Sequence, residues 1–243
     1  MWAVPLTPAP DGRRTAAAAR RRAREAEIVA ATRALFDDKG MREAQIDDIA
    51  KAVGVNRAIV YRHFTGKEDL FALTMVSYLE ELAGLLDAAS RAARTPESRL
   101  VGIVTAFADY ALAHPAFVDC AQALMRRPGS ELLDEVSERA LLKLGRGMAA
   151  CLSATSSAIE DGVAAGDFTV QDPTLLANTL YASGLGALML ARSGLVIRES
   201  APGVPVVGEI SAEQVKQYMV ATALAAARSP SVEETRQRRH RTR

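Results

Sequence analysis

Alanine is the most abundant residue of this chain, and its abundance limits the possible folds more than any other feature. Of the 243 residues, 46 are alanine, whereas only 12 are aromatic. Alanine has the highest intrinsic helix propensity, and aromatic residues favour strands. With 49% hydrophobic residues and a net charge of +1, the chain can also bury a real core. We therefore expect an all-α fold of closely packed helices.

Several features indicate a soluble, cytoplasmic protein. Two cysteines, Cys120 and Cys151, are too few for a disulfide framework or a structural zinc site. The first residues lack the apolar core of a secretory signal. The longest uncharged run, 173–191, contains Asn178 and Ser183, which favours a buried helix over a membrane span. We expect no metal, no cofactor and no membrane partner.

The charge is unevenly distributed. Residues 1–24 carry six arginines and one aspartate, and residues 229–243 carry five arginines and two glutamates. The segment between them, 25–228, has a net charge of −7. Basic arms at both ends suit the phosphate backbone of nucleic acid, although two solvated tails that only improve solubility would look the same. We expect a disordered basic arm over 1–24 and a basic tail over 229–243.

Apolar spacing and capping residues predict about nine helices and no strand. Asn56 is a good N-cap, and Thr65 and Ser211 each begin a sequence with capping-box spacing. Five glycines and prolines mark residues 194–210 as a loop. The helices are expected over about 16–39, 47–53, 56–64, 68–93, 96–113, 116–125, 130–165, 173–193 and 211–227.

Two of these helices form a helix-turn-helix pattern. They are short, they meet at Gly54, and the second presents Arg57, Tyr61, Arg62 and His63. Such a unit places its second helix in the DNA major groove. Many helical proteins contain two short helices joined at a glycine, and the preceding basic arm strengthens the case for DNA.

Several residues at fixed spacing over 28–71 point to one family. They are Ala31, Phe36, Gly40, Ile49, Ala50, Gly54, Val55, Tyr61, His63, Phe64, Lys67, Glu68 and Leu70. This segment resembles the DNA-binding domain of the TetR family of transcriptional regulators, and residues 162–190 resemble its C-terminal helices more loosely. The resemblance implies a homodimer. Each subunit would have a three-helix DNA-binding domain, residues 25–71, and a helical ligand-binding and dimerisation domain, residues 72–228.

The resemblance also implies roles for individual side chains. Tyr61, His63 and Lys67 match phosphate-facing positions, while Arg57 and Ile59 match positions that face bases. An arginine can bind guanine through two hydrogen bonds, and an isoleucine can contact a thymine methyl group. The chain departs from the family pattern at Ala44-Gln45, where a threonine pair is usual, and at 56–59, where Ser-x-Gly/Ala-Thr is usual. The candidate DNA-contacting residues are Arg20, Arg21, Arg22, Arg24, Gln45, Asn56, Arg57, Ala58, Ile59, Tyr61, Arg62, His63 and Lys67.

The arginines of the arm enter this set because of charge. Residues 25–71 contain seven basic and nine acidic side chains, which is unfavourable for a DNA-binding domain. We expect the four arginines between residues 20 and 24 to supply the missing positive charge, by following phosphates or by entering a minor groove.

A ligand site is expected between the helices of residues 96–192. Few charged residues fall within 100–125 and 140–159, which favours an apolar effector such as an acyl chain. Small residues over 182–187 allow close helix packing, either in a four-helix dimer interface with the last helix or inside one subunit. Core packing is the alternative role for every candidate lining residue: Phe107, Tyr110, Phe117, Met125, Met148, Cys151, Tyr181 and Met189.

These expectations combine into one function and one alternative. No histidine has a carboxylate or cysteine at ligand or catalytic spacing, so we do not expect an enzyme. We expect a ligand-responsive regulator, most simply a repressor whose homodimer leaves a palindromic operator when an effector binds; activation remains open. The alternative is a helical sensor or carrier of lipids or small molecules that has weak or lost operator binding.

Overall fold

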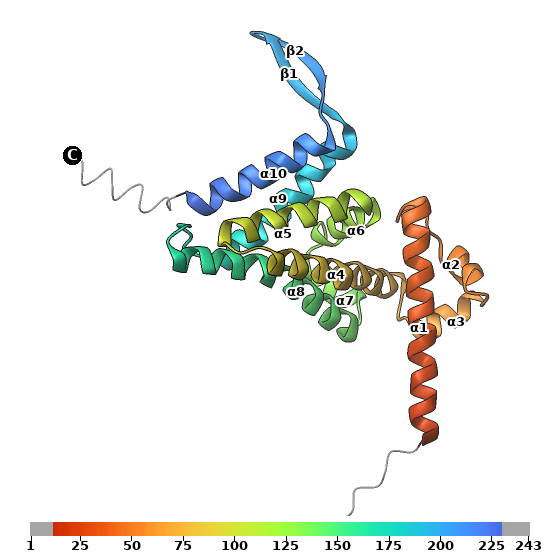
Figure 1. Ribbon diagram of the computed structural model, residues 1–243. Helices are drawn as coiled ribbons and strands as arrows, with labels where there is room; N and C mark the ends of the chain where they lie inside the picture. The colour runs from red at the N-terminus through yellow and green to blue at the C-terminus, as the bar shows by residue number, and fades with distance from the viewer. Residues whose placement is uncertain (1–11, 230–243) are drawn as a thin grey trace, which may run out of the picture.

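The computed structural model describes residues 12–229, which form ten helices and one two-stranded sheet (Figure 1). The elements in chain order are α1 (Gly12–Lys39), α2 (Ile46–Ala52), α3 (Arg57–His63), α4 (Lys67–Ala92), α5 (Pro96–Ala113), α6 (Pro115–Met125), α7 (Gly129–Glu135), α8 (Glu138–Ala165), α9 (Pro173–Ser193), β1 (Leu195–Ala201), β2 (Val204–Glu209) and α10 (Ala212–Arg228). The expected all-α class is confirmed for this part of the chain.

The N-terminal domain has its own small core. Ile28 of α1, Ile49 of α2 and Val60 of α3 are almost completely buried, together with Leu70 at the start of α4. The turn between α2 and α3 requires a left-handed residue, and Gly54 supplies it with a φ of +67°. The core and this turn fix the angle at which α3 is presented.

The C-terminal domain is built around α4, which packs along both α5 and α8 (Figure 1). Tyr78, Leu79 and Leu82 of α4 are almost fully buried in the larger core. Gly147 allows α8 to approach closely, because a Cβ there would lie 3.1 Å from the Cβ of Leu79. Since Leu70 of the same helix belongs to the smaller core, α4 connects the two domains.

Two predicted elements differ from the structure. The helix expected over 130–165 is two helices, α7 and α8, because Ser137 caps a new start by accepting a hydrogen bond from the Ala140 amide at 3.3 Å. The loop expected over 194–210 is an antiparallel hairpin, β1–β2. Both strands contain valine or isoleucine, which favour strands. Gly203 lies in the turn between them, with a φ of +78°.

The basic arm also differs from its prediction. Residues 12–24 are the first half of α1 rather than a disordered segment, which the alanines at 16–19 explain. Residues 1–11 lie outside the described part of the chain. The predicted basic tail, apart from Ser229, lies outside it as well.

Helix α9 meets the length and hydropathy criteria for a membrane span, and it is the one helix among residues 12–229 that does so by itself. A core helix of a soluble protein passes the same test. One face of α9 is buried through Ala177, Gly184, Leu185 and Leu188. The expectation that α9 is a buried helix is wrong for the single chain, because only 22% of its apolar window is buried.

Candidate nucleic-acid interface and ligand cavity

Helix α3 presents one side to solvent. Its inner side is held by Val60, which is 1% exposed, whereas Arg57, Ala58, Tyr61 and Arg62 are exposed. Ile59 is half-buried. The Asn56 side chain accepts a hydrogen bond from the Ile59 amide at 3.0 Å and so caps the helix as predicted. Of the predicted base-facing and phosphate-facing residues, the structure thus exposes Arg57 and Tyr61 on this surface.

Arg57 is held by two neighbours on this surface. Its Nη2 donates to the Tyr61 hydroxyl at 3.3 Å, and its Nη1 lies 3.6 Å from Asp47 Oδ2. The bond to Tyr61 and the charge of Asp47 raise the pKa of Arg57. The Arg57 guanidinium is thus already engaged by two side chains on this surface.

Three other candidate DNA-contacting residues, His63, Lys67 and Gln45, differ in their exposure and contacts. The His63 ring is half-buried, and its Nδ1 lies 3.8 Å from Glu25 Oε1 and has no hydrogen-bond partner among the described residues. The prediction that His63 shares the exposed face with Tyr61 is therefore wrong. Lys67 is half-buried at the start of α4, with its Nζ 4.9 Å from the centre of the Phe71 ring. The exposed Gln45 is the N-cap residue of α2 but makes no side-chain cap bond.

The capping box predicted at Thr65 does not form. The N-cap residue of α4 is Gly66, which has no side chain to accept a hydrogen bond. The box predicted at Ser211 does form, with Gln214 as its second member.

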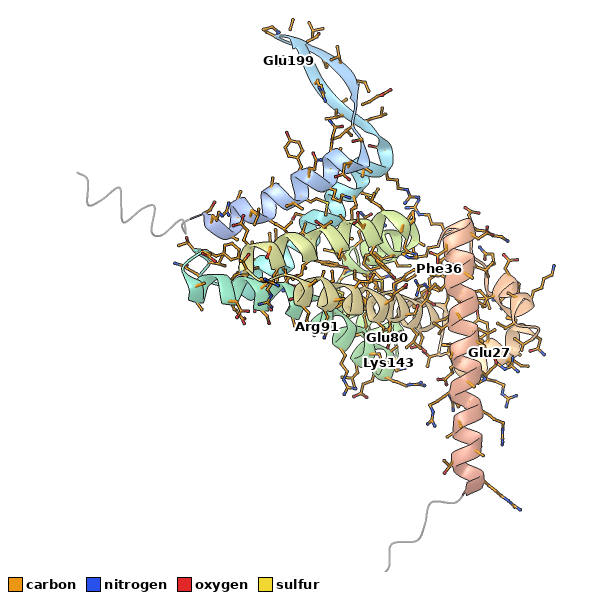
Figure 2. All side chains as sticks on the ribbon, in the orientation of Figure 1. Glu27, Phe36, Glu80, Arg91, Lys143 and Glu199 are labelled. Atoms are coloured by element: carbon orange, nitrogen blue, oxygen red, sulfur yellow. The ribbon has the colours of Figure 1, made fainter. Side chains whose placement is uncertain are left out.

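The arginines of the arm belong to the first half of α1. This half of the helix extends beyond the rest of the molecule (Figures 1 and 2). Arg21 bonds Glu25 at 3.1 Å and Arg24 pairs with Glu27 at 2.8 Å, while Arg20 and Arg22 are exposed. A helix with side chains is about 10–12 Å wide and a minor groove about 6 Å, so only single arginine side chains of this arm would fit into one. Between residues 12 and 71 there are thirteen basic and nine acidic residues. The arm thus reverses the sign of the domain's charge.

A polar cluster joins the two domains through α1, α4 and α5. Arg33 bonds Glu81, and the Tyr110 hydroxyl lies 3.0 Å from the same Glu81 carboxylate. The Tyr78 hydroxyl donates to Asp37 at 2.8 Å, and the Arg33 guanidinium lies 4.3 Å from the centre of the Tyr78 ring. The bond from Arg33 lowers the pKa of Glu81, and burial raises the pKa of both tyrosines. No local spacing of residues in the sequence indicates this cluster.

A second junction attaches the start of α8 to the N-terminal domain. The buried Glu25 of α1 accepts bonds from Arg139 at 2.7 Å and from Arg21 at 3.1 Å. Burial acts to raise the pKa of Glu25, but the two arginines together lower it. Asp69 of α4 accepts from both the amide and the hydroxyl of Ser137, at 3.1 and 2.6 Å. The start of α8 is therefore bonded directly to both α1 and α4.

The C-terminal domain contains a cavity of about 310 Å³ between α4, α5, α8, α9 and α10. Its walls are mainly apolar, and none of its described lining residues is charged. Its lining residues with a hydroxyl group are Thr155, Tyr181, Ser183, Tyr218 and Thr222. Burial raises the pKa of Tyr181, and it raises the pKa of the Cys151 thiol to about 12, so both groups are neutral.

Three of the eight predicted ligand-lining residues, Phe107, Cys151 and Tyr181, line this cavity. The other five lie elsewhere. Tyr110 and Phe117 are buried in the core, Met148 packs half-buried against it, and Met125 and Met189 are exposed. The predicted lining did not include residues of α4 and α10, although the apolar spacing along these two helices could have indicated them. These lining residues are Leu82, Leu86, Val215, Met219 and Ala223.

The described residues 12–229 contain no group of three or more His, Cys, Asp or Glu side chains that could hold a metal ion. The fold and the two sites instead define a helical protein in which a helix-turn-helix domain is joined by a long helix to a cavity-containing domain.

Residues 28–74 match the model of the family "Bacterial regulatory proteins, tetR family". The transcriptional activator FasR of Mycolicibacterium smegmatis is 29% identical over 87 residues, or 36% of this chain and 40% of FasR. The regulator BetI of Cronobacter sakazakii is 30% identical over 124 residues, or 49% of this chain and 61% of BetI. These matches thus cover about two fifths to three fifths of each relative. Residues 28–74 are thus a segment of the TetR family of bacterial regulatory proteins, and the matches support a TetR-family regulator.

Solved structures share the fold at low sequence identity. RolR in complex with resorcinol has a TM-score of 0.62 at 17% identity, covering 90% of this chain and 94% of RolR. FadR from Bacillus subtilis in complex with stearoyl-CoA has a TM-score of 0.60 at 13% identity, covering 82% and 97%. The likeness extends through both domains.

Proposed function

We propose that this protein is a cytoplasmic, ligand-responsive transcriptional regulator whose homodimer binds a palindromic DNA operator and, as a repressor, leaves it when an effector binds. The observation that carries the proposal is the free outer face of α3, which presents Arg57, Tyr61 and Arg62 beside a basic helical arm. A helix held in this way fits the major groove, and two copies related by a two-fold axis would contact successive grooves about 34–36 Å apart. The family match of residues 28–74 supports the same function.

The outer faces of α9 and α10 are suited to form the dimer interface. On α9 the exposed side chains that precede Arg192 are uncharged, and they include Ala182, Ser183 and Met189. On α10 the exposed Tyr218 and Ala221 continue this surface. An uncharged helix face of this size is rarely left in water by a soluble protein, and two helices from each subunit would bury it in a four-helix bundle.

The cavity indicates the chemistry of the effector. Its lining carries no charge, so an ionised group buried there would have no partner. The Thr155 and Tyr181 hydroxyls make no hydrogen bond with any described residue, and they can serve one or two oxygens of a ligand. We therefore expect a neutral, mainly apolar effector, or an apolar chain whose charged head stays outside. The structural neighbours bound to resorcinol and to stearoyl-CoA carry ligands of these two kinds.

Helix α4 provides the connection between ligand and DNA. Leu82 and Leu86 line the cavity, while Glu81 on the same helix bonds Arg33 of α1. A ligand that displaces this stretch of α4 would change the angle of α1 and the distance between the two α3 helices. Complete release requires roughly 5 kcal/mol of preference for the DNA-free arrangement.

Selection of bound DNA from a random pool by the full-length protein tests the proposal. We expect one palindromic sequence, bound with a steep salt dependence. Arg57→Ala should weaken binding to it by about tenfold or more, because one base contact is worth about 1–3 kcal/mol. The matched control is Arg91→Ala, which removes an exposed arginine that pairs with Asp87 at the far end of α4. Failure to select any duplex would contradict the proposal.

One observation favours the alternative of a sensor or carrier without operator binding. Arg57 is engaged by Asp47, and Ala44-Gln45 provides no hydroxyl before α2. In that case a neutral apolar compound would bind the cavity, measured by calorimetry, while no DNA sequence would be selected.

A further inference from the structure

The hairpin formed by β1 and β2, residues 195–209, does not resemble an ordinary surface loop. Its strands pair in a continuous antiparallel register with one irregularity near the turn. Five of its apolar side chains are exposed: Leu195, Ile197, Val204, Val206 and Val207. Ile197 and Val207 are 70% and 65% exposed, among the highest values for large apolar side chains in the described chain.

The apolar residues are ordered by the strand pairing. Ile197 is the direct partner of Val207, and Leu195 lies two residues before Ile197, so these three share one face. We call this the Ile197 face. The opposite face is partly covered, because the Arg198 side chain lies over Gly208. Both faces expose apolar side chains, and the Ile197 face carries the two most exposed of them, Ile197 and Val207.

The body of the same subunit does not cover the Ile197 face. The hairpin projects away from the helices, with Glu199 near its tip (Figures 1 and 2). The two ends of the hairpin are joined to each other by the bond from the Ile210 amide to the Gly194 carbonyl at 3.0 Å. An isolated two-stranded hairpin is only marginally stable in water, and an exposed apolar strand surface invites association. A second molecule is therefore needed to cover the Ile197 face.

A second copy of this chain is the occupant that the position of the hairpin favours. The hairpin connects α9 to α10, so it continues the uncharged surface that includes Leu190 and Tyr218, which are 46% and 73% exposed. Two-fold pairing through that surface would place each hairpin beside the partner subunit. An anionic membrane is disfavoured, because the Ile197 face also carries Glu199 and Glu209.

We propose that the hairpin is an intersubunit arm whose Ile197 face packs on the partner subunit. This inference rests on the dimer of the proposed function and extends it beyond the four-helix bundle. It also concerns the ligand site, because Ile210, at the base of the arm, lines the cavity. Leu190 and Tyr218 combine cavity lining with surface exposure, so the partner subunit would close the cavity on this side.

The test is the dimer dissociation constant of the full-length protein, measured by sedimentation equilibrium. Ile197→Glu with Val207→Glu should raise it by about tenfold or more, because two apolar side chains lose a buried position. Val204→Glu with Val206→Glu introduces the same charge on the opposite face and should change it by less than about twofold. Circular dichroism shows whether both variants keep their helices. In the wild type, hydrogen exchange at Ile197 and Val207 should speed up when the dimer is diluted to monomer.

The outcomes separate the arm from the dimer. If the wild type is a dimer and both variants leave its dissociation constant unchanged, the arm is wrong while the proposed dimer stands. If the two variants weaken the dimer equally, the assignment to the Ile197 face is wrong. If the wild type is monomeric at all concentrations, the proposed dimer fails together with the arm. If the Ile197 face instead binds phosphatidylglycerol vesicles, the occupant is a membrane and the arm is again wrong.

Discussion

At the scale of single residues, Asp47 is notable because it forms an ion pair with Arg57, a residue predicted to contact DNA. Its carboxylate lies 3.6 Å from the guanidinium, and both side chains are more than half exposed. Exposed pairs of this kind are worth at most about 1 kcal/mol, so DNA can displace Asp47 at modest cost. An acidic side chain beside α3 also repels phosphates.

We therefore predict that Asp47→Asn strengthens operator binding by about threefold to tenfold at low salt, with a smaller gain at high salt. Fluorescence anisotropy with the selected operator measures this. Asp87→Asn is the control, since it removes an exposed carboxylate near the C-terminal end of α4, away from α3. Equal affinities for the wild type and Asp47→Asn would refute the idea that Asp47 competes with DNA.

The buried Glu25 predicts a pH dependence of stability. Arg139 and Arg21 lower its pKa below the ordinary 4.5, so its ionised form stabilises the folded state at pH values above 4.5. This contribution is lost as the pH falls through the lowered pKa. Glu25→Gln should cost about 2 kcal/mol at pH 7, as is typical of hydrogen bonds to a charged group, and much less in acid.

Urea denaturation of Glu25→Gln and the wild type at several pH values measures that difference. A difference that stays constant between pH 7 and pH 3 would show that the charge of Glu25 contributes nothing.

Residues that act locally could be predicted from the sequence, and residues that depend on distant partners could not. Asn56 caps α3 as expected because its partner, Ile59, is three positions away. The orientation of His63 depends on Glu25, which is itself held by Arg139, 114 positions further along the chain. No local pattern records that contact.

At the scale of elements, glycines on α8 distinguish a packed face from a free one. A Cβ at Gly162 would lie 2.1 Å from Cδ2 of the Phe168 ring, whereas a Cβ at Gly145 would meet nothing within 4 Å. Gly162 therefore makes room for the ring, and Gly145 makes room for no neighbour.

We predict that Gly162→Ala lowers the free energy of unfolding by about 1–3 kcal/mol, because Phe168 must move. Gly145→Ala on the same helix should raise it by up to about 1 kcal/mol, because alanine has the higher helix propensity. Thermal denaturation of the two variants measures the contrast. A Gly162→Ala variant as stable as the wild type would mean that the ring relocates freely.

Most helices could be predicted because caps, prolines and apolar spacing are local signals. Helix α9 begins at Pro173 behind the Asp172 cap, as the sequence indicates. The hairpin was missed because its glycines and prolines, typical of a loop, outweighed the valines that pair across the strands. Strand pairing depends on two segments at once, and a single segment does not reveal it.

At the scale of the whole molecule, the cluster of Arg33, Glu81 and Tyr110 is placed to transmit a change in the cavity to the DNA-binding surface. Tyr110 stands on α5, whose Ile103 and Phe107 line the cavity. Its hydroxyl reaches Glu81 of α4 at 3.0 Å and the Tyr78 carbonyl oxygen at 3.2 Å.

Tyr110→Phe keeps the ring and removes these bonds. We predict that it leaves ligand affinity within about twofold and reduces the ligand-induced loss of operator affinity by about fivefold or more, within the usual range of coupling free energies. Operator dissociation constants with and without the effector measure the coupling. An unchanged ratio would show that the signal passes through α8 and Arg139 instead.

The two-domain plan could be expected only from the resemblance of residues 28–71 to a known family, because helix periodicity does not divide the chain. The junctions could not, because they join α1 to helices that come much later in the chain. The cavity was predictable only in part. The low charge of the central segments indicated apolar walls, but the lining residues of α10 depend on how the last helix packs against the others.

Because α4 belongs to both hydrophobic cores, neither domain can melt without exposing part of the other. Heating should therefore unfold the described part of the chain in one cooperative step. A compound that occupies the cavity should then protect α1, at the opposite end of the molecule, against proteolytic cleavage as strongly as it protects the cavity walls.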